Sequence, residues 1–587
     1  MIPARLLAWL GSRRATWAAF LLIVFLSLPA LSTGVQHDDF IHQTLLHELP
    51  SAQRRSPDEL YCFVGGPHSR PAAVAPPWWQ AADHSVCFFR PLSSLSLAID
   101  HTLLMRPPML AHGHALLWFL LLCAAVYALA RRLLPPVQAR LALLIYGMSS
   151  FGISGVAWLA ARHSLISATL ATFSVLLYVA GRADLRPLRT TLGLLGLALS
   201  LLAGESALSA FAFIAAYEFF LAKDAPQRRA AWLGLAASGA LAYVIWYGRA
   251  GYGMKNVGPY LDPLRQPGPF LRELPSRLLA LFSEALFGLP STLWHAPTYR
   301  PLYWLLGGLG LALLVAIGFL SRVGRDPEVA RRLRFCALGA LLAAIPMTAA
   351  VLGGRLLLIP GLGLSLLFAL LLHPPQASEP ASPRPAPRLL RGLLVLLAGL
   401  LFVANPVFRV AQSLSLRQIA AAELRIPNSF LAPCDTADHY YLLGSDDFTV
   451  AMFAPFLLHE QLRRKEWRQI TLASSDITIE ALSEKTLRLR SQPPGLLLGG
   501  FVYELTRPPH LPLQPGQRVP IGLGEIHVEE VSPRGVSSLR LELSVPHSGG
   551  SICWLRFDGT HLSPLQITSR NVHEKQIIPY VKGAAPF

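Results

Sequence analysis

Long runs of apolar residues, separated by short polar stretches, occupy most of the first 410 positions of the chain. An α-helix needs about 20 apolar residues to cross a bilayer, and most of the runs are close to that length. Their spacing predicts eleven membrane-spanning helices. The predicted spans lie at about 15–32, 115–130, 141–159, 165–180, 190–204, 207–221, 230–247, 302–320, 335–352, 356–372 and 389–407.

Basic residues cluster in every second connection between these runs. The basic connections are 131–140, 182–189, 223–229, 321–334 and 384–391. Lys and Arg are enriched in cytoplasmic loops, so the alternation predicts a cytoplasmic N-terminus and external loops at 34–108 and 248–300. An odd number of spans places the C-terminal part outside as well. A cleaved signal peptide is the alternative for the first run, but the many later spans favour an uncleaved helix.

The pattern changes after residue 424, where apolar and polar positions alternate in short segments such as TLRLRS and SLRLELSV. Turns that contain Gly or Pro separate these segments, which is typical of antiparallel strands. We therefore predict a mainly α fold in which a polytopic helical membrane domain is followed by an extracytoplasmic β-rich, sandwich-like domain. The predicted parts are the membrane domain at 1–410, a linker at 411–424 and the β-rich domain at 425–587.

Composition agrees with a membrane protein. Of the 587 residues, 53% are hydrophobic and only 14% are charged, whereas roughly a quarter of a soluble protein is charged. The net charge of +17 is explained by the basic connections that set topology. No nucleic-acid-binding motif is present, so the lipid bilayer is the expected partner and a bacterial inner membrane the expected location.

Four of the six cysteines fall in segments that are predicted to be external. Cys62 and Cys87 share the first loop, and Cys434 and Cys553 share the C-terminal region. Disulfides persist outside the cytoplasm, so the pairs Cys62–Cys87 and Cys434–Cys553 are predicted. The other two cysteines lie inside apolar runs and are interpreted as packing residues.

Two adjacent carboxylates, Asp38 and Asp39, directly follow the first predicted span, between His37 and His42. Like charges at this distance raise each other's pKa, and so does a neighbouring low-dielectric medium. Ionisable groups in this setting commonly have a function in membrane proteins.

Further ionisable residues occur at the predicted external ends of the spans: Arg90, His112, His114, Arg162, His163, Glu205 and Arg355. Taken singly, each has a simple interpretation, such as an arginine that reaches the headgroups or a glutamate that caps a helix. Together they converge on one face. Arginines suit a phosphate, and a carboxylate can orient or deprotonate an acceptor hydroxyl or amine. The set is consistent with glycosyl transfer from a polyprenyl-phosphate sugar.

The layout resembles the GT-C superfamily of integral membrane glycosyltransferases, and within it the branch related to protein O-mannosyltransferases. In that superfamily one or two acids follow the first span, and Asp38 and Asp39 match that position. Gly204 stands where the branch commonly has a lysine. The similar segments, within about 1–410, are FRPLSSLSLAID (89–100), LAHGHALLWFLL (110–121), AWLAARHSLISA (157–168), LLAGESALSAFAFIAAYEFF (201–220) and GGRLLLIPGLG (353–363).

The resemblance implies an inverting glycosyltransferase in which Asp39 or Asp38 is the catalytic acid or base toward the acceptor, with Asp39 favoured. The donor phosphate would be bound by Arg162, Glu205, Arg355 and Arg90. Histidines that could contact substrate or a metal are His37, His42, His112, His114 and His163. Some members of the superfamily need a divalent cation and others do not, so the cofactor stays open. The sugar and the acceptor, which could be a protein, a lipid or a glycan, also stay open.

Two other functions use the same features. A transporter or flippase of lipid-linked saccharides also carries charges in a membrane domain, but charges at mid-span and broken helices in repeated halves would be expected. A non-catalytic envelope scaffold would bind partners through the C-terminal domain and would not need the two adjacent aspartates.

Overall fold

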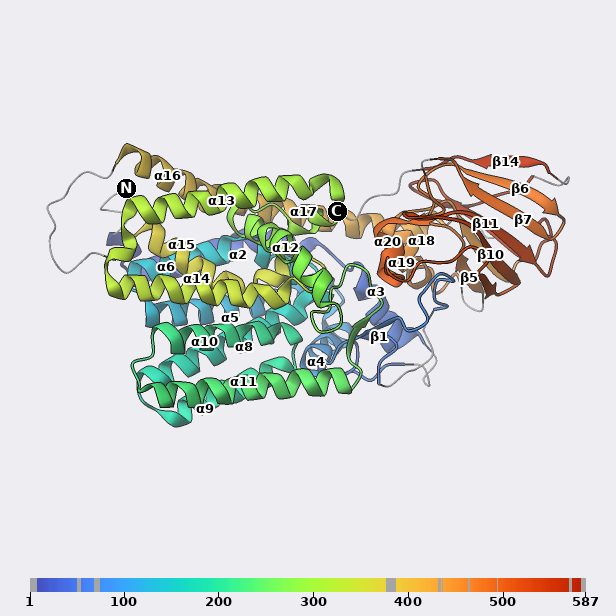
Figure 1. Ribbon diagram of the computed structural model, residues 1–587. Helices are drawn as coiled ribbons and strands as arrows, with labels where there is room; N and C mark the ends of the chain where they lie inside the picture. Colours follow the sequence, from blue (N-terminus) through green and yellow to red (C-terminus); the bar gives the residue numbers. More distant parts are fainter. Residues whose placement is uncertain are drawn as a thin grey trace.

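The computed structural model describes residues 8–49, 54–67, 74–375, 387–430, 434, 436–462, 465–493, 495–568 and 573–581. A bundle of roughly parallel and antiparallel helices forms one part, and a β-rich domain lies at one end of this bundle (Figure 1). The predicted fold class, a mainly helical membrane domain followed by a β-rich domain, is therefore confirmed.

All eleven predicted spans contain helix. The helices are α2 (Arg13–Ser27), α5 (Pro108–Leu133), α6 (Pro136–Met148), α8 (Arg162–Ala183), α9 (Pro187–Leu201), α10 (Phe211–Phe220), α11 (Pro226–Arg249), α13 (Arg300–Ser321), α14 (Pro327–Met347), α15 (Pro360–Leu372), α16 (Arg388–Gly399) and α17 (Asn405–Glu423). Within the described residues, six helical segments are long and apolar enough to cross a membrane, or seven if a bent pair at 136–157 counts as one span. The chain is a membrane protein, although several of the predicted spans are short.

The short helices have identifiable causes. The bent pair, α6 and the short α7 (Ser154–Ala157), turns by 57° between its two parts. Pro residues begin α9 and α15, and these helices have only 15 and 13 residues. A proline fits the first turn of a helix, where its missing N–H has no partner to lose, so these prolines set where α9 and α15 begin.

The basic connections 182–189, 223–229 and 321–334 lie at the bundle end away from the β-rich domain (Figure 1). Ion pairs link three of the basic connections: Asp184 pairs with Arg132 and Arg189, and Arg182 pairs with Asp224. The alternation of basic and non-basic connections along the sequence therefore corresponds to the two ends of one bundle.

The two predicted external loops contain their own structure. Helices α3 (Asp38–Gln43), α4 (Pro91–Ile99) and α12 (Pro267–Phe287) lie in them. Strands β1 (Cys62–Val64), β2 (Ser85–Cys87) and β3 (Gly253–Lys255) form an antiparallel sheet that joins the two loops. A disulfide links Cys62 and Cys87 across neighbouring strands of this sheet.

The C-terminal domain has two sheets, which share a core of buried residues (Figure 1). The larger has the order β14-β6-β7-β11-β10-β9 with β8 beside β11, and the smaller has the order β13-β12-β4-β5. The strands are β4 (His439–Leu443), β5 (Glu466–Gln469), β6 (Ile477–Ser483), β7 (Thr486–Ser491), β8 (Leu498–Gly499), β9 (Arg518–Ile521), β10 (Gly524–Ser532), β11 (Gly535–Leu543), β12 (Ile552–Phe557), β13 (Leu562–Pro564) and β14 (Lys575–Ile578).

The smaller sheet differs from the purely antiparallel pattern that the sequence suggested. Its strand β4 runs parallel to both β12 and β5. A parallel connection needs a crossover, and the apolar helix α19 (Phe448–Leu457) provides it between β4 and β5. Two short helices, α18 (Arg425–Ser429) and α20 (Gly500–Thr506), complete the domain. A second disulfide links Cys434 and Cys553, and residues 411–423 of the expected linker continue helix α17.

Two adjacent tryptophans attach the first loop to the C-terminal domain. The indole N–H of Trp78 donates to the carbonyl of Ile470 at 3.0 Å, and that of Trp79 donates to the hydroxyl of Thr506 at 3.0 Å. Both rings belong to the same buried cluster as the core of the two sheets. Arg507 also donates to the Trp79 carbonyl. We call this contact the tryptophan clamp; it fixes the domain against the end of the bundle.

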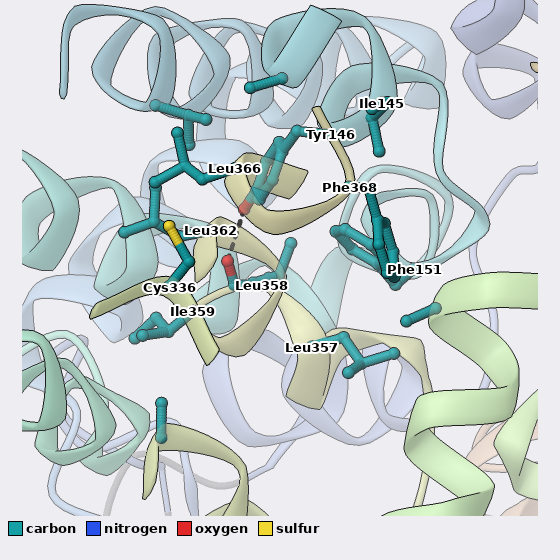
Figure 2. Packing of buried hydrophobic residues seen from close by; sticks show 14 of the residues in the cluster. Ile145, Tyr146, Phe151, Cys336, Leu357, Leu358, Ile359, Leu362, Leu366 and Phe368 are labelled. Carbon is teal, nitrogen blue, oxygen red and sulfur yellow. Dashed lines mark hydrogen bonds between the residues drawn. The ribbon is translucent and has the colours of Figure 1, made fainter. Parts of the chain in front are cut away.

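A large apolar core lies inside the bundle, and Leu357 and Leu358, from the turn before α15, belong to it (Figure 2). Tyr146 of α6 donates from its hydroxyl to the carbonyl of Leu358 at 2.6 Å, as the dashed line in Figure 2 shows. Gly354 approaches the backbone of Phe151 so closely that a Cβ would lie 2.8 Å from its Cα. The turn before α15 is therefore held from two sides.

Candidate functional site

A cavity of about 1210 Å³ lies where the bundle, the two loops and the C-terminal domain meet. Ionisable side chains from the bundle end line one part of it: His37, Asp38, Arg90, His163, Glu205, Glu284 and Arg355. Apolar side chains from α19 line another part: Phe448, Met452, Phe453 and Phe456. Its volume is above the range typical of drug-sized ligands, and its lining is largely apolar with a few charges.

The two adjacent aspartates at the start of α3 have different surroundings. Asp39 is fully buried; it accepts hydrogen bonds from the backbone N–H of Ala160 at 2.8 Å and of Gln36 at 3.2 Å. Asp38 is half-buried and lines the cavity. The structure therefore places Asp38 at the cavity wall and Asp39, the favoured acceptor-facing group, behind it among backbone donors; which of the two acts toward the acceptor stays a prediction.

Burial sets the ionisation of both aspartates. It raises the pKa of Asp39 to about 7, against the two backbone hydrogen bonds that lower it. Burial also raises the pKa of Asp38, and the neighbouring charges of His37 and then Arg355 oppose the rise. The positive charges beside Asp38 therefore decide whether it can serve as a base near neutral pH.

Arg90 and Glu205 form a two-pronged ion pair at the cavity wall. The Nε of Arg90 donates to Oε2 of Glu205 at 2.9 Å, and the Nη2 donates to Oε1. The guanidinium also lies over the ring of Phe88 at 4.0 Å and that of Tyr61 at 5.1 Å. Because its charge is paired and its faces are covered, Arg90 is held in one position.

Arg355 has a different environment. Its guanidinium lies 5.8 Å from the centre of the Trp158 ring and donates to the carbonyl of Val351 at 3.3 Å. Within the part of the chain that the structure describes, it is the cavity-lining arginine without a carboxylate partner; Arg265 and Arg468 pair with Asp262 and Glu466. Arg355 is therefore available for an anionic ligand.

Arg162 lies behind the cavity and does not line it. Its guanidinium forms an ion pair with Asp100, a fully buried carboxylate, and contacts the Nδ1 of His114 at 3.3 Å. His114 itself lies 2.8 Å from the other oxygen of Asp100. Arg162 is 1% exposed. The structure thus places Arg162, predicted to bind the donor phosphate, and His114, predicted as a possible substrate or metal contact, in a charge network with Asp100 outside the cavity lining.

Of the other four predicted histidines, two line the cavity and two do not. His112 is buried and engaged, with Nδ1 2.8 Å from the carbonyl of Val156 and Nε2 3.1 Å from that of Gly34. His42 is buried against the ring of Tyr61, at 5.2 Å between centres. Neither lines the cavity, whereas His37 and His163 do.

The described residues around Asp38 and Asp39 do not bring three metal-ligating atoms together. Within the described part of the chain, such a group occurs at Glu525, His527 and Glu542, on neighbouring strands β10 and β11. The residues near the two aspartates that were suggested as metal ligands therefore do not form a ready coordination set in this arrangement.

Two acidic residues of the site were not singled out from the sequence. Glu284 of α12 lines the cavity; its Oε2 accepts from the N–H of Ser291 at 2.9 Å and from its hydroxyl. Glu423 at the end of α17 contacts His37. Glu284 could have been recognised as an acid within the predicted external loop 248–300. The second stands in an ordinary polar segment and gives no signal of its own.

No protein-family model matches the chain, and no curated protein matches it in sequence. A similar solved structure is the crystal structure of the Archaeoglobus fulgidus oligosaccharyltransferase, tethered through a disulfide bond to an acceptor peptide that contains the NVT sequon. The match has 12% identity and a TM-score of 0.36; it covers 77% of this chain and 64% of the archaeal chain. The chain thus spans less than two thirds of the archaeal protein. A likeness this distant does not define a family.

Proposed function

We propose that the protein is a membrane glycosyltransferase of the GT-C type, which moves a sugar from a polyprenyl-phosphate donor to an acceptor outside the cytoplasm. One observation carries the proposal: Asp38 shares one large cavity, at the end of a membrane helix bundle, with Arg355, which has no carboxylate partner among the described residues. The resemblance of the segments around Asp38, Arg90, Glu205 and Arg355 to that superfamily supports it.

The roles follow from the chemistry of the groups. Asp38, as a carboxylate, accepts the proton of the acceptor hydroxyl or amine while the acceptor attacks the anomeric carbon. The bond from that carbon to the phosphate oxygen breaks, and the bonding electron pair leaves with the polyprenyl phosphate. Arg355 stabilises the negative charge on this leaving group. Attack from the side opposite the phosphate inverts the configuration at the anomeric carbon.

Arg90 and Glu205 have a supporting role in this scheme. Their mutual pairing places a neutral, rigid unit at the cavity wall, against which the donor is positioned. The apolar wall from α19 suits the hydrocarbon part of a lipid-linked molecule. The basic connections at the opposite bundle end support an orientation in which the cavity faces away from the cytoplasm, as in a bacterial inner membrane.

Transfer can be tested with membranes that contain the full chain, supplied with radiolabelled polyprenyl-phosphate sugars one at a time. Label should pass to a lipid, protein or glycan fraction with the wild type and not with Asp38→Asn. The matched control is Asp184→Asn, an Asp to Asn change at the opposite bundle end. Transfer by Asp38→Asn at the wild-type rate would contradict the proposal. So would movement of the labelled lipid across vesicles without any transfer, which would indicate a flippase.

A further inference from the structure

His37 lies where three parts of the chain meet beside the cavity: the segment after α2, the end of α17 and helix α19. Glu423 holds it at two points. One carboxylate oxygen lies 2.6 Å from Nδ1 of His37, and the other accepts the backbone N–H of His37 at 2.9 Å. Glu423 is fully buried. A buried carboxylate needs a partner of opposite charge, which a protonated imidazole supplies.

The C-terminal domain encloses the imidazole from the other side. The ring of Phe453 stacks on it at 5.4 Å, and that of Phe448 meets it edge-on at 5.8 Å. The hydroxyl of Thr449, also on α19, lies 3.5 Å from Glu423. From the bundle, Trp158 contacts the imidazole edge-on at 5.6 Å. Neighbours from both the bundle and α19 thus hold the imidazole of His37 beside the cavity.

The backbone at His37 is also constrained. Its φ of 52° lies in the left-handed region, which is uncommon for residues other than glycine. Such conformations cost free energy, persist only where the surroundings impose them and cluster at functional sites. Here the hydrogen bond from the His37 N–H to Glu423 helps to hold the conformation. The next residue is Asp38, so the orientation of His37 determines where α3 and its first carboxylate begin.

We propose that the His37–Glu423 ion pair keeps the Asp38 carboxylate ionised and correctly placed, and that α19 completes this arrangement from the C-terminal domain. The inference rests on the proposed role of Asp38 as the base. His37 and Glu423 are then positioning residues, which act on the reaction through Asp38. The C-terminal domain becomes part of the catalytic unit rather than an attachment that only selects acceptors.

The charges around His37 support this assignment. Facing it are Glu423 from α17 and Asp38 and Asp39 from α3, while α19 presents uncharged rings. Burial lowers the pKa of His37, but these carboxylates raise it more, so the net effect favours the protonated imidazole. For Asp38, burial is the largest influence, and it raises the pKa. The positive charges of His37 and then Arg355 lower the pKa of Asp38, and the negative charge of Glu423 raises it by less than either of them lowers it. Loss of the His37 charge therefore raises the pKa of Asp38.

A chemical probe can follow Asp38 without any enzymatic assay. A hydrophobic carbodiimide reacts with the protonated form of a buried carboxyl group, and mass spectrometry locates the adduct. The purified full chain is labelled from about pH 4 to about pH 9, a range that includes ordinary and raised carboxyl pKa values. An Asp38→Asn variant identifies the label that belongs to Asp39. Glu484→Gln, a Glu to Gln change on an exposed turn of the C-terminal domain, is the matched control.

Both Glu423→Gln and His37→Gln should shift the midpoint of Asp38 labelling to higher pH by about one unit or more. The double variant should shift it no further than His37→Gln alone, because Glu423→Gln raises the pKa of Asp38 only by letting His37 lose its proton, and that proton is already absent when His37 is replaced. An unchanged midpoint in either single variant overturns the inference, and so do shifts that add. If either variant does not fold, the other still decides.

Sugar transfer measured on the same proteins separates this inference from the proposed function. A labelling shift in a chain that transfers no sugar supports the ion pair and contradicts the glycosyltransferase. The variants could also lose activity equally at all pH values while the labelling midpoint of Asp38 stays unchanged. That result would mean that the His37–Glu423 pair is only structural, and it would overturn the inference. One result supports both the glycosyltransferase function and the ion-pair inference. In Glu423→Gln, the ascending limb of the pH–rate profile moves to higher pH together with the labelling midpoint of Asp38.

Discussion

Arg90 and Glu205 neutralise each other at the wall of the cavity through two hydrogen bonds. Three arginines were predicted at this face of the bundle: Arg90, Arg162 and Arg355. Arg90 is paired with Glu205, and Arg162 is paired with Asp100 behind the cavity wall. Arg355 alone among these three has no carboxylate partner in the described part of the chain. Under the proposed function, stabilisation of the anionic leaving group therefore depends on Arg355.

Replacing Arg355 by Gln should lower sugar transfer about 10²–10³-fold, as expected when a preorganised donor to a developing anion is removed. Arg355→Lys should retain part of the activity, because the charge remains but the planar fork is lost. Transfer from a radiolabelled polyprenyl-phosphate sugar measures both. Arg322→Gln, in a connection at the other end of the bundle, is the control. Equal activities of Arg355→Gln and wild type would exclude a role for Arg355 in leaving-group stabilisation.

The two aspartates should respond differently to the same change. Asp38→Asn should reduce transfer about 10²–10⁴-fold, the range for loss of a general base, with little effect on thermal unfolding because the group is half-buried in a cavity. Asp39→Asn should mainly destabilise, because an amide cannot accept both backbone N–H groups. Transfer rates and unfolding midpoints in detergent separate the two. The reverse result would return Asp39 to the catalytic position.

Stability should depend on pH through Asp39. Its pKa in the folded protein, about 7, is higher than the ordinary value of about 3.9. A raised folded pKa favours folding at low pH, and this contribution is lost as the pH rises from about 4 through about 7. The unfolding midpoint of the wild type should therefore fall more between pH 5 and pH 8 than that of Asp39→Asn. Parallel pH profiles for the two proteins would contradict the raised pKa.

The buried pair of Arg162 and Asp100 should behave as a structural unit. Removing one partner leaves an unpaired buried charge, so Arg162→Met should cost about 3–5 kcal/mol of unfolding free energy. Replacing both, in Arg162→Met with Asp100→Leu, should recover a large part of that loss. Denaturant or thermal unfolding in detergent provides the measurement. A single variant of normal stability that loses activity would instead indicate that Arg162 contacts the substrate.

The tryptophan clamp should be needed for the assembled site. Trp79→Ala removes a ring that is 2% exposed and should cost about 3–5 kcal/mol. It should also loosen the C-terminal domain, measured as increased amide hydrogen exchange in α19 and α20. Trp304→Ala, where the ring is 51% exposed on the bundle surface, is the control. Unchanged exchange in Trp79→Ala would show that other contacts suffice to hold the domain.

Local patterns made much of the fold predictable. Apolar run length indicated the helices, the basic connections identified one end of the bundle, and alternation indicated the strands of the C-terminal domain. The parallel order around β4 was not predictable, because α19 is an apolar segment that could equally have been a strand. The hydrophobic pattern of the sequence also did not reveal that several of the predicted spans, such as those of α9 and α15, form helices shorter than a full span.

The site was predictable only in part. Its position at one bundle end followed from the order of the ionisable residues, and Asp38, Arg90, Glu205 and Arg355 do line the cavity. Which of two adjacent aspartates faces a cavity depends on a rotation of one short helix, which the sequence does not encode in any local pattern. The pairing of Arg162 with Asp100 depends likewise on tertiary distance. Glu423 lies 386 residues from its partner His37.

The tryptophan clamp also has a consequence for biosynthesis. Trp78 and its partner Ile470 are 392 residues apart, and at a synthesis rate of about 5–20 residues per second the partner arrives roughly 20–80 s later. During that interval two large indole rings of the first loop have no core to enter. The nascent chain therefore passes through a stage in which its helices can insert while the cavity still lacks one wall. Any factor that shields exposed aromatic surface outside the membrane would act at this stage.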